Sequence, residues 1–370
     1  MLLVYAALFL LLGPAQPSWA DQRKAFLMLD YPTSIVFPQG RLEVSGEIMA
    51  MSETLDVFDV KETEISNNRK DMGSLGDMRG GRLTCNYGLF ESTTMHAKYA
   101  LRDLDYGFGN MQVHTYGFSL KQNLYKDKYS LFPSLSLTAG IKGNIAEDKK
   151  YTSENDINRF INQFNLGGFS FHEDEDRIYF DSDIGSISVK KDGPNPDVTL
   201  EDSNDFSWFS RITMGKTIED FYPNIFFEYG QTLVEGEIDS SLQYYAQQIE
   251  FIDIPLPNLP QDLSRRSRYW KVGSVMILDM PWNLLGTAEY FYMHISRENS
   301  LNRVTDNHVL KGNISYFINE HLAISLLGEY YHHQYNGVIP FLYNEYTEGG
   351  FDKKYGEMSI GITYMLPGED

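Results

Sequence analysis

The chain has 370 residues, a formal net charge of −20 and one cysteine, Cys85. The acidic balance argues against nucleic-acid binding, which needs basic patches, and the single cysteine excludes an intrachain disulfide and a cysteine-rich metal site. Aromatic residues reach 14%, yet the mean hydropathy is only −0.35.

The first twenty residues carry no charged side chain and include an apolar run from Leu2 to Leu12. This run is too short for a helix that spans a bilayer, which takes roughly 20 apolar residues. Ser18 and Ala20 place small residues just before Asp21, as at the cleavage site of a secretory signal peptide. We therefore expect residues 1–20 to be removed on export.

Apolar and polar residues alternate with period two in many later segments, which predicts β-strands with two different faces. The alternation is most regular in residues 41–50, 134–145, 308–318 and 356–366. Less regular strand candidates are 81–90, 93–104, 109–122, 206–217, 223–237, 268–280, 284–297 and 320–334. An exported, acidic, aromatic-rich chain of such segments is typical of an all-β, antiparallel transmembrane β-barrel, in which only alternate residues face lipid.

Connections between these segments alternate in length, as expected when one end of a barrel has tight turns and the other has long loops. Counted back from the last strand, the connections at 319–320, 281–283 and 218–223 are short, whereas those at 335–353 and 238–267 are long. The sequence therefore predicts that the long loops are external and that the short turns are periplasmic.

The number of strands depends on residues 146–205, which form either one large external excursion or include an extra hairpin. We favour 12 strands, with 14 as the alternative, and expect the strand at 41–51 to pair with the last one. The barrel is assigned to residues 41–366. Residues 21–40 are expected to lie in the periplasm or to plug the lumen.

Strand alternation also assigns charged side chains to the inside of the barrel. The residues expected to face the lumen are Glu43, Glu47, Lys142, Lys311 and Glu357. They are of both signs, and the acidity of the whole chain suggests a weak preference for cations if the lumen conducts.

The last strand, "SIGITYML", resembles the C-terminal assembly signal of bacterial outer-membrane proteins through Ser359, Gly361, Tyr364 and Leu366. Typical members end on the final aromatic residue, whereas this chain continues through a tail at 367–370. The resemblance implies a location in the bacterial outer membrane of a Gram-negative-type cell. It also implies contact with lipid, lipopolysaccharide and the barrel-assembly machinery.

With about 12 strands and no large passenger domain upstream, residues 41–366 are similar in size and architecture to the translocator domain of autotransporters. The likeness is to a solitary barrel of that type and includes no diagnostic motif. A translocator role is what it implies, although the chain shows nothing obvious to translocate.

His294 and Ser296 lie two residues apart, so a strand places them on one face. Outer-membrane phospholipase resembles this in having His-x-Ser on one strand and an Asn on the next, where the Asn orients the His. Here Asn302 or Asn307 could orient the histidine that activates the serine. Because the spacing and surroundings match that family poorly, we expect polar rim residues and no enzyme.

The acidic run at 172–183 offers Asp174, Asp176, Asp181 and Asp183 as oxygen ligands for a hard cation. It lacks the glycine-containing loop of a calcium motif. We expect solvated charge here, and no metal or cofactor. Aromatic residues crowd 330–346, which predicts an external girdle at the membrane interface.

These features favour a non-enzymatic pore or a structural barrel. A surface adhesin that uses the long loops at 238–267 and 335–353 is the first alternative. A membrane-embedded hydrolase built on His294 and Ser296 is the second.

Overall fold

The structure is a computed structural model that describes residues 31–51, 78–105, 110–125, 133–163, 169–182, 185–218, 220–248, 261–298, 301, 304–333, 336–344 and 354–366. Residues 1–20, which are expected to be a signal peptide, and the tail at 367–370 lie outside the described residues.

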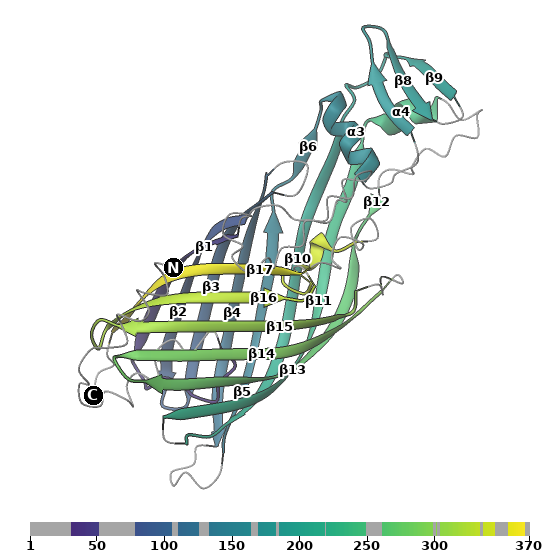
Figure 1. Ribbon diagram of the computed structural model, residues 1–370. Coiled ribbons are helices and arrows are strands. Elements are labelled where there is room, and N and C mark those ends of the chain that lie inside the picture. Colours follow the sequence, from purple (N-terminus) through teal and green to yellow (C-terminus); the bar gives the residue numbers. More distant parts are fainter. Residues whose placement is uncertain are drawn as a thin grey trace.

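Twelve antiparallel strands close into a barrel (Figure 1), which confirms the predicted fold class and the preferred strand number. In chain order the wall strands are β1 (Leu42–Met51), β2 (Met78–Phe90), β3 (Thr93–Asp105), β4 (Asn110–Tyr125), β5 (Ser134–Ala146), β10 (Val198–Gly215), β11 (Phe221–Ser240), β13 (Arg265–Met280), β14 (Leu284–Arg297), β15 (Asp306–Phe317), β16 (Leu322–Tyr331) and β17 (Tyr355–Leu366). β17 pairs with β1 from Leu42 opposite Leu366 to Ala50 opposite Met358. This pairing removes both sheet edges.

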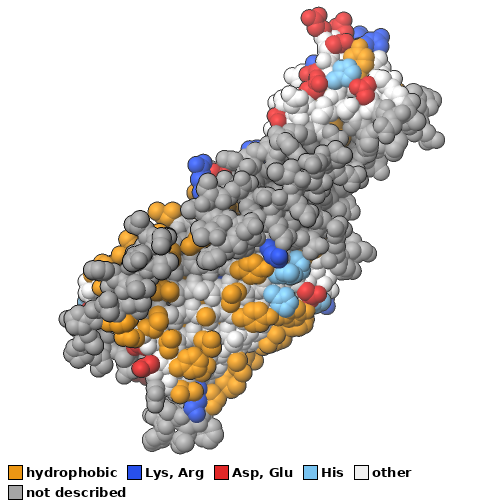
Figure 2. All heavy atoms as spheres, in the orientation of Figure 1, with side chains coloured by type: hydrophobic (Ala, Val, Ile, Leu, Met, Phe, Trp, Pro, Cys, Tyr) orange, Lys and Arg blue, Asp and Glu red, His pale blue; other side chains and the backbone are white. Residues whose placement is uncertain are grey.

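The wall has an apolar outside and a polar inside. On β1 and β17, Ile48 and Ile360 are 77% and 63% exposed, whereas Glu43, Ser359 and Thr363 are at most 5% exposed. Figure 2 shows hydrophobic side chains over the outside of the barrel. Such a surface is stable only in lipid, and a closed barrel leaves no backbone group of its wall unpaired there. The protein is therefore an outer-membrane β-barrel. No helix in the described ranges is long and apolar enough to cross a bilayer.

The connections at one end of the barrel are tight. They include residues 91–92 between β2 and β3, and 281–283 between β13 and β14. Trp282 and Asn283 adopt left-handed backbone angles (φ 62° and 61°), which reverse the chain within this three-residue connection. At the other end, the long connections include 147–197 and 332–354.

The connection between β5 and β10 forms an extension that is external to the barrel wall rather than further wall strands. β6 (Lys149–Tyr151) and β12 (Gln261–Asp262) pair with the overhanging ends of β10 and β11. Beyond them lie α3 (Glu154–Gln163), α4 (Leu242–Gln247) and a three-stranded sheet of β7 (Phe169–Glu173), β8 (Arg177–Ser182) and β9 (Gly185–Lys190), as Figure 1 shows. Residues 147–197 are thus an excursion from the wall, as the preferred count of 12 strands requires, whereas residues 198–205 belong to β10.

The extension has an apolar core of its own. Ile157, Phe160, Phe171 and Phe180 are at most 1% exposed. The Asn158 side chain joins α3 to β7, because its amide nitrogen donates to the backbone oxygen of Phe171 and its oxygen accepts from the backbone nitrogen of Phe171 at 2.6 Å. The extension is therefore packed in the manner of a soluble domain.

Candidate functional site: the barrel lumen

The lumen contains a charged triad on three neighbouring strands. Arg211 on β10, Glu228 on β11 and Lys271 on β13 face one another in register. The Glu228 carboxylate is 2% exposed, pairs with the Arg211 guanidinium and accepts from Lys271 Nζ at 3.0 Å. Phe226 lies under Arg211, with 5.7 Å from the guanidinium carbon to the ring centroid. One buried carboxylate thus holds two cations, which leaves positive charge in excess here.

A second network connects the two ends of the chain. Arg82 on β2 pairs with Glu47 on β1 and, at 3.5 Å, with Glu329 on β16. Glu329 also pairs with Lys311 on β15 at 3.3 Å and accepts from the Tyr331 hydroxyl. These interactions span the seam where the barrel closes, so they tie β15 and β16 to β1 and β2.

The five residues expected in the lumen all lie on inward-facing positions of their strands. Glu43 accepts from Asn86 Nδ2 at 3.1 Å, and Lys142 lies over the Tyr269 ring at 4.9 Å from its centroid. Glu47 and Lys311 belong to the second network, and Glu357 faces Glu329 across the strand pair.

Most of the charged lumen residues were not identified from the sequence. Arg82, Glu228 and Glu329 lie in segments where the two faces are mixed, which hid the inward position of each charge. For two of them a signal was present, since Glu228 and Glu329 are charged residues within runs of apolar and aromatic ones.

The charge of the lumen is opposite in sign to that of the whole chain. The basic side chains on inward positions of the described wall are Arg82, Lys98, Arg102, Lys121, Lys142, Arg211, Arg265, Lys271, Arg297 and Lys311. The acidic ones are Glu43, Glu47, Asp205, Glu228, Asp279, Glu289, Glu329 and Glu357. Basic groups are in the majority, so the local field of the lumen favours anions.

At the end with tight turns, residues 31–40 contact the inside of the wall. Lys121 Nζ donates to Thr33 Oγ1 at 3.3 Å and to the Ile35 backbone oxygen at 3.2 Å. The backbone nitrogen of Phe37 donates to Thr94 Oγ1 at 2.7 Å. Pro38 approaches so closely that a Cβ at Gly88 would lie 1.8 Å from its oxygen, so this contact requires glycine.

At the end with long loops, residues 336–344 fold inward. Arg265 Nη2 donates to the Pro340 oxygen at 2.6 Å, and Asn144 Nδ2 donates to the Val338 oxygen at 3.1 Å. Gly337 has φ 76°, and a Cβ there would meet Met293 at 2.5 Å. We name this stretch the inward loop. Its short helix η1 (Pro340–Leu342) contacts β10 and β11.

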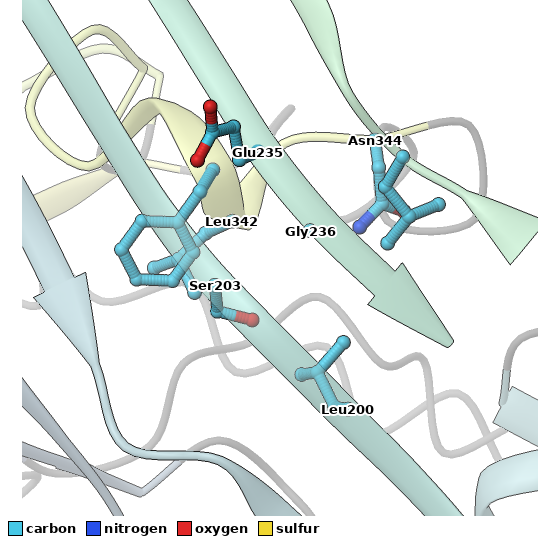
Figure 3. A pocket seen from close by; sticks show the side chains of 8 residues that line it. Leu200, Ser203, Glu235, Gly236, Leu342 and Asn344 are labelled. Atoms are coloured by element: carbon cyan, nitrogen blue, oxygen red, sulfur yellow. The ribbon is translucent and has the colours of Figure 1, made fainter. Parts of the chain in front are cut away.

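The inward loop overturns the predicted girdle for part of residues 330–346. Phe341 and Tyr343 are 7% and 1% exposed, and the Tyr343 hydroxyl accepts from the Val304 backbone nitrogen at 3.1 Å. Figure 3 shows a small pocket beside the loop, where Leu342 lies near Ser203 and Leu200 of β10. The aromatic residues of this stretch fill the mouth of the lumen instead of facing lipid.

The predicted catalytic pair lies on the outside of the wall. His294 and Ser296 share the outer face of β14, and no hydrogen bond joins them. His294 Nδ1 instead bonds Asp306 Oδ1 at 2.8 Å, and the same carboxylate accepts from the Tyr292 hydroxyl. Asn307 faces inward and donates to the backbone oxygen of His333 at 3.0 Å. Asn302 lies outside the described residues.

The predicted metal ligands are not brought together. Asp174 caps the turn between β7 and β8, where bonds from the Tyr179 hydroxyl and from the backbone of Asp176 and Arg177 lower its pKa. Asp181 pairs with His172 at 2.7 Å. Asp183 lies outside the described residues. Within the described part of the chain, no three His, Cys, Asp or Glu side chains are grouped to hold a metal ion.

The residues that resemble an assembly signal lie on β17. Tyr364 and Leu366 face outward and are 48% and 45% exposed, whereas Ser359 donates to Glu47 at 3.1 Å. A Cβ at Gly361 would lie 2.7 Å from Glu47 Cγ. The glycine therefore makes room for the Glu47 side chain, and so for its pair with Arg82.

No family model matches the chain, and no curated protein matches it. Among solved structures it is similar to the translocator domain of the autotransporter NalP from Neisseria meningitidis, with 8% identity, 89% of each chain covered and a TM-score of 0.45. It is also similar to a FadL homologue from Pseudomonas aeruginosa, with 10% identity, 95% of each chain covered and a TM-score of 0.47. The NanC porin gives 9% identity, 88% coverage of this chain, 100% of that chain and a TM-score of 0.40. These values do not place the chain in any of these families.

Proposed function

We propose that the protein is a channel for small anionic solutes, narrowed at its two ends by residues 31–40 and by the inward loop. The observation that carries the proposal is the basic majority of the lumen in a chain whose net charge is −20. Total charge controls solubility and long-range association, whereas the walls of a narrow passage control which ions enter it.

The way in which both end segments are attached supports a channel over an inert filling. Lys121, Asn144 and Arg265 hold them through hydrogen bonds to backbone oxygens. Each such bond contributes only a small net free energy, about 0.5–1.5 kcal/mol for neutral donors and 1.5–3 kcal/mol for charged ones. Displacing either segment would expose the donors to water or to a passing anion.

Conductance in planar bilayers tests the proposal. We compare the wild type with a variant in which residues 336–344 are replaced by a glycine-serine linker of equal length. The variant should conduct more, and its reversal potential in a KCl gradient should show preference for chloride over potassium. A Lys142→Glu substitution in that background should shift the preference toward potassium.

Arg79→Glu provides the matched control, because Arg79 lies on the outer face of β2 and pairs with Asp103 at 2.8 Å. It should leave ion preference unchanged. Preference for potassium in the loop-replaced variant, or no conductance when residues 22–40 are also removed, would contradict an anion channel.

Surface recognition by the external extension is a second candidate, and its separate apolar core favours this role. Tyr151 and Val198 face each other across β6 and β10, so an Asn-Gly turn between them can replace residues 152–197. The shortened protein should still fold and conduct. Loss of binding to cells or phages that recognise the wild type would support recognition, and unchanged binding would exclude it.

A further inference from the structure

Two rows of side chains cross the outer face of β11, β13 and β14 near the end with long loops. Gln231, Arg268 and Ser296 are in register and form the donor row. The aromatic row is Tyr229, Trp270 and His294, which are aligned in the same way one outward position closer to the apolar wall.

The order of side chains along β13 matches the layers of a bilayer. Val272 and Met276 are apolar and 47% and 49% exposed, Trp270 follows, and Arg268 and Arg266 come after it. Alternate residues of a strand are about 7 Å apart. Trp270 therefore takes the interfacial position typical of aromatic rings, and Arg268 lies at the depth of lipid headgroups.

Arg268 is exposed, and its guanidinium makes no hydrogen bond or ion pair with any residue in the described ranges. Its neighbours in the donor row are an amide and a hydroxyl, neither of which carries charge. An arginine flanked by neutral donors presents the planar fork that matches phosphate oxygens.

The carboxylates near the donor row have other partners. Asp306 accepts from Tyr292, from His294 and, at 3.0 Å, from Thr305 Oγ1. Glu298 accepts from the Arg266 backbone nitrogen at 3.1 Å. The Trp270 ring is 5.8 Å from that of His294, so the rings of the aromatic row support one another.

We propose that the donor row binds the phosphate of a lipid headgroup in the outer leaflet, with Arg268 as the main contact and the aromatic row against the lipid below it. The basis of this proposal is that the positive charge of Arg268 lies at the depth of the negatively charged headgroup phosphates. The proposal is independent of whether the lumen conducts.

Native mass spectrometry of the full-length barrel in detergent tests the proposal. The probes are lipid A with both phosphates, its dephosphorylated form, and inorganic phosphate as competitor. The wild type should retain the phosphorylated lipid about tenfold better than Arg268→Ala, since a charged hydrogen bond at an interface is worth roughly that ratio. Arg268→Lys should give an intermediate value.

Arg79→Ala is the control, because it removes another outward arginine, and it should behave as the wild type. The shift in gel mobility on heating shows that each variant is folded. Equal retention by Arg268→Ala and wild type, or equal retention of both lipids by the wild type, would overturn the proposal. Displacement by millimolar inorganic phosphate would indicate a site for free phosphate and would also overturn it.

Discussion

The barrel wall and the external extension share the strand β10 but treat its side chains in opposite ways. In the wall, Trp208 and Ile212 face lipid and are 43% and 51% exposed, while Asp205 is buried in the lumen. In the extension, Val198 and Leu200 are buried. The part of β10 in the wall therefore has apolar residues on its outer face, whereas the part in the extension has apolar residues on its inner face.

A β-bulge separates the two parts. The register of β10 against β11 shifts between Glu201 and Asn204, and Asp202 has φ 52°. Because side chains alternate, one extra residue moves every later side chain to the opposite face. The bulge lets the buried set change from even-numbered positions above it to odd-numbered ones below it.

The strand β11 marks the boundary of the lipid without a bulge. On its outer face Leu233 is 49% exposed, and the next outward residues are Glu235, Glu237 and Asp239. Three carboxylates at successive outward positions cannot face hydrocarbon. The comparison thus shows that strands with the same two-residue period of side chains can face either lipid or water. On β11 the outer face changes from lipid to water just beyond Leu233.

The sharpest way to break this comparison is to remove one partner of an ion pair in each region. Glu228→Ala leaves the half-buried Arg211 and Lys271 without their carboxylate, which should reduce the free energy of unfolding by up to about 3 kcal/mol. Lys150→Ala breaks the pair of Lys150, 59% exposed, with Asp197 in the extension and should cost much less, because water screens an exposed pair.

Urea unfolding in lipid vesicles measures both losses, followed by tryptophan fluorescence for the barrel and by limited proteolysis for residues 147–197, which contain no tryptophan. Equal small losses would show that the lumen around Glu228 is hydrated well enough to screen its charges, and the contrast between the regions would fail.

Arginine substitutions on the outer face of β11 locate the lipid boundary. Ile225→Arg places a charge on a side chain that is 55% exposed in the apolar band, which should cost about 2–4 kcal/mol if it lies near the bilayer midplane. Glu237→Arg on the same face should change stability by less than about 0.5 kcal/mol. The same unfolding assay reports both, and a large loss for Glu237→Arg would place the boundary farther out.

Much of the wall could be predicted because lipid on one side and the polar lumen on the other impose an alternating pattern within each single strand. The alternation of Ile360 and Ile362 with Ser359 and Thr363 needs no partner to be recognised. The pairs of Arg82 with Glu329 and of Glu47 with Gly361 depend on closure between distant parts of the chain. Period alone does not supply that information.

Two local features were missed for different reasons. The inward loop contains the apolar stretch of Val338, Ile339 and Phe341 within an external connection, and the sequence does not say whether such residues turn inward or toward lipid. The bulge at Asp202 lies in a polar run, "EDSND", in which no apolar residue marks a change of face.

The extension should be more sensitive to acid than an apolar core alone would be. Burial would raise the pKa of Asp197, but bonds from Lys150 and Ser241 outweigh it and lower the pKa; bonds from Tyr179 and the backbone also lower the pKa of Asp174. A lowered folded-state pKa gives stability above the ordinary value near 3.9 that is lost as pH falls through the folded value. Limited proteolysis at pH 3 and pH 7 should show faster cleavage within 147–197 at pH 3, and equal rates would contradict this.

The smallest expected effect concerns the bulge itself. The left-handed backbone of Asp202 costs an ordinary residue about 1–2 kcal/mol, and glycine avoids most of this. Asp202→Gly should therefore stabilise the extension by up to about 1 kcal/mol, because the bond from the Asp202 backbone nitrogen to Asp148 at 3.1 Å is retained. Asp202→Val should destabilise it, since a β-branched residue disfavours this conformation. Deletion of Asp202 is the decisive variant: if Val198 and Leu200 remain protected from hydrogen exchange without the extra residue, the bulge is not what changes the buried face.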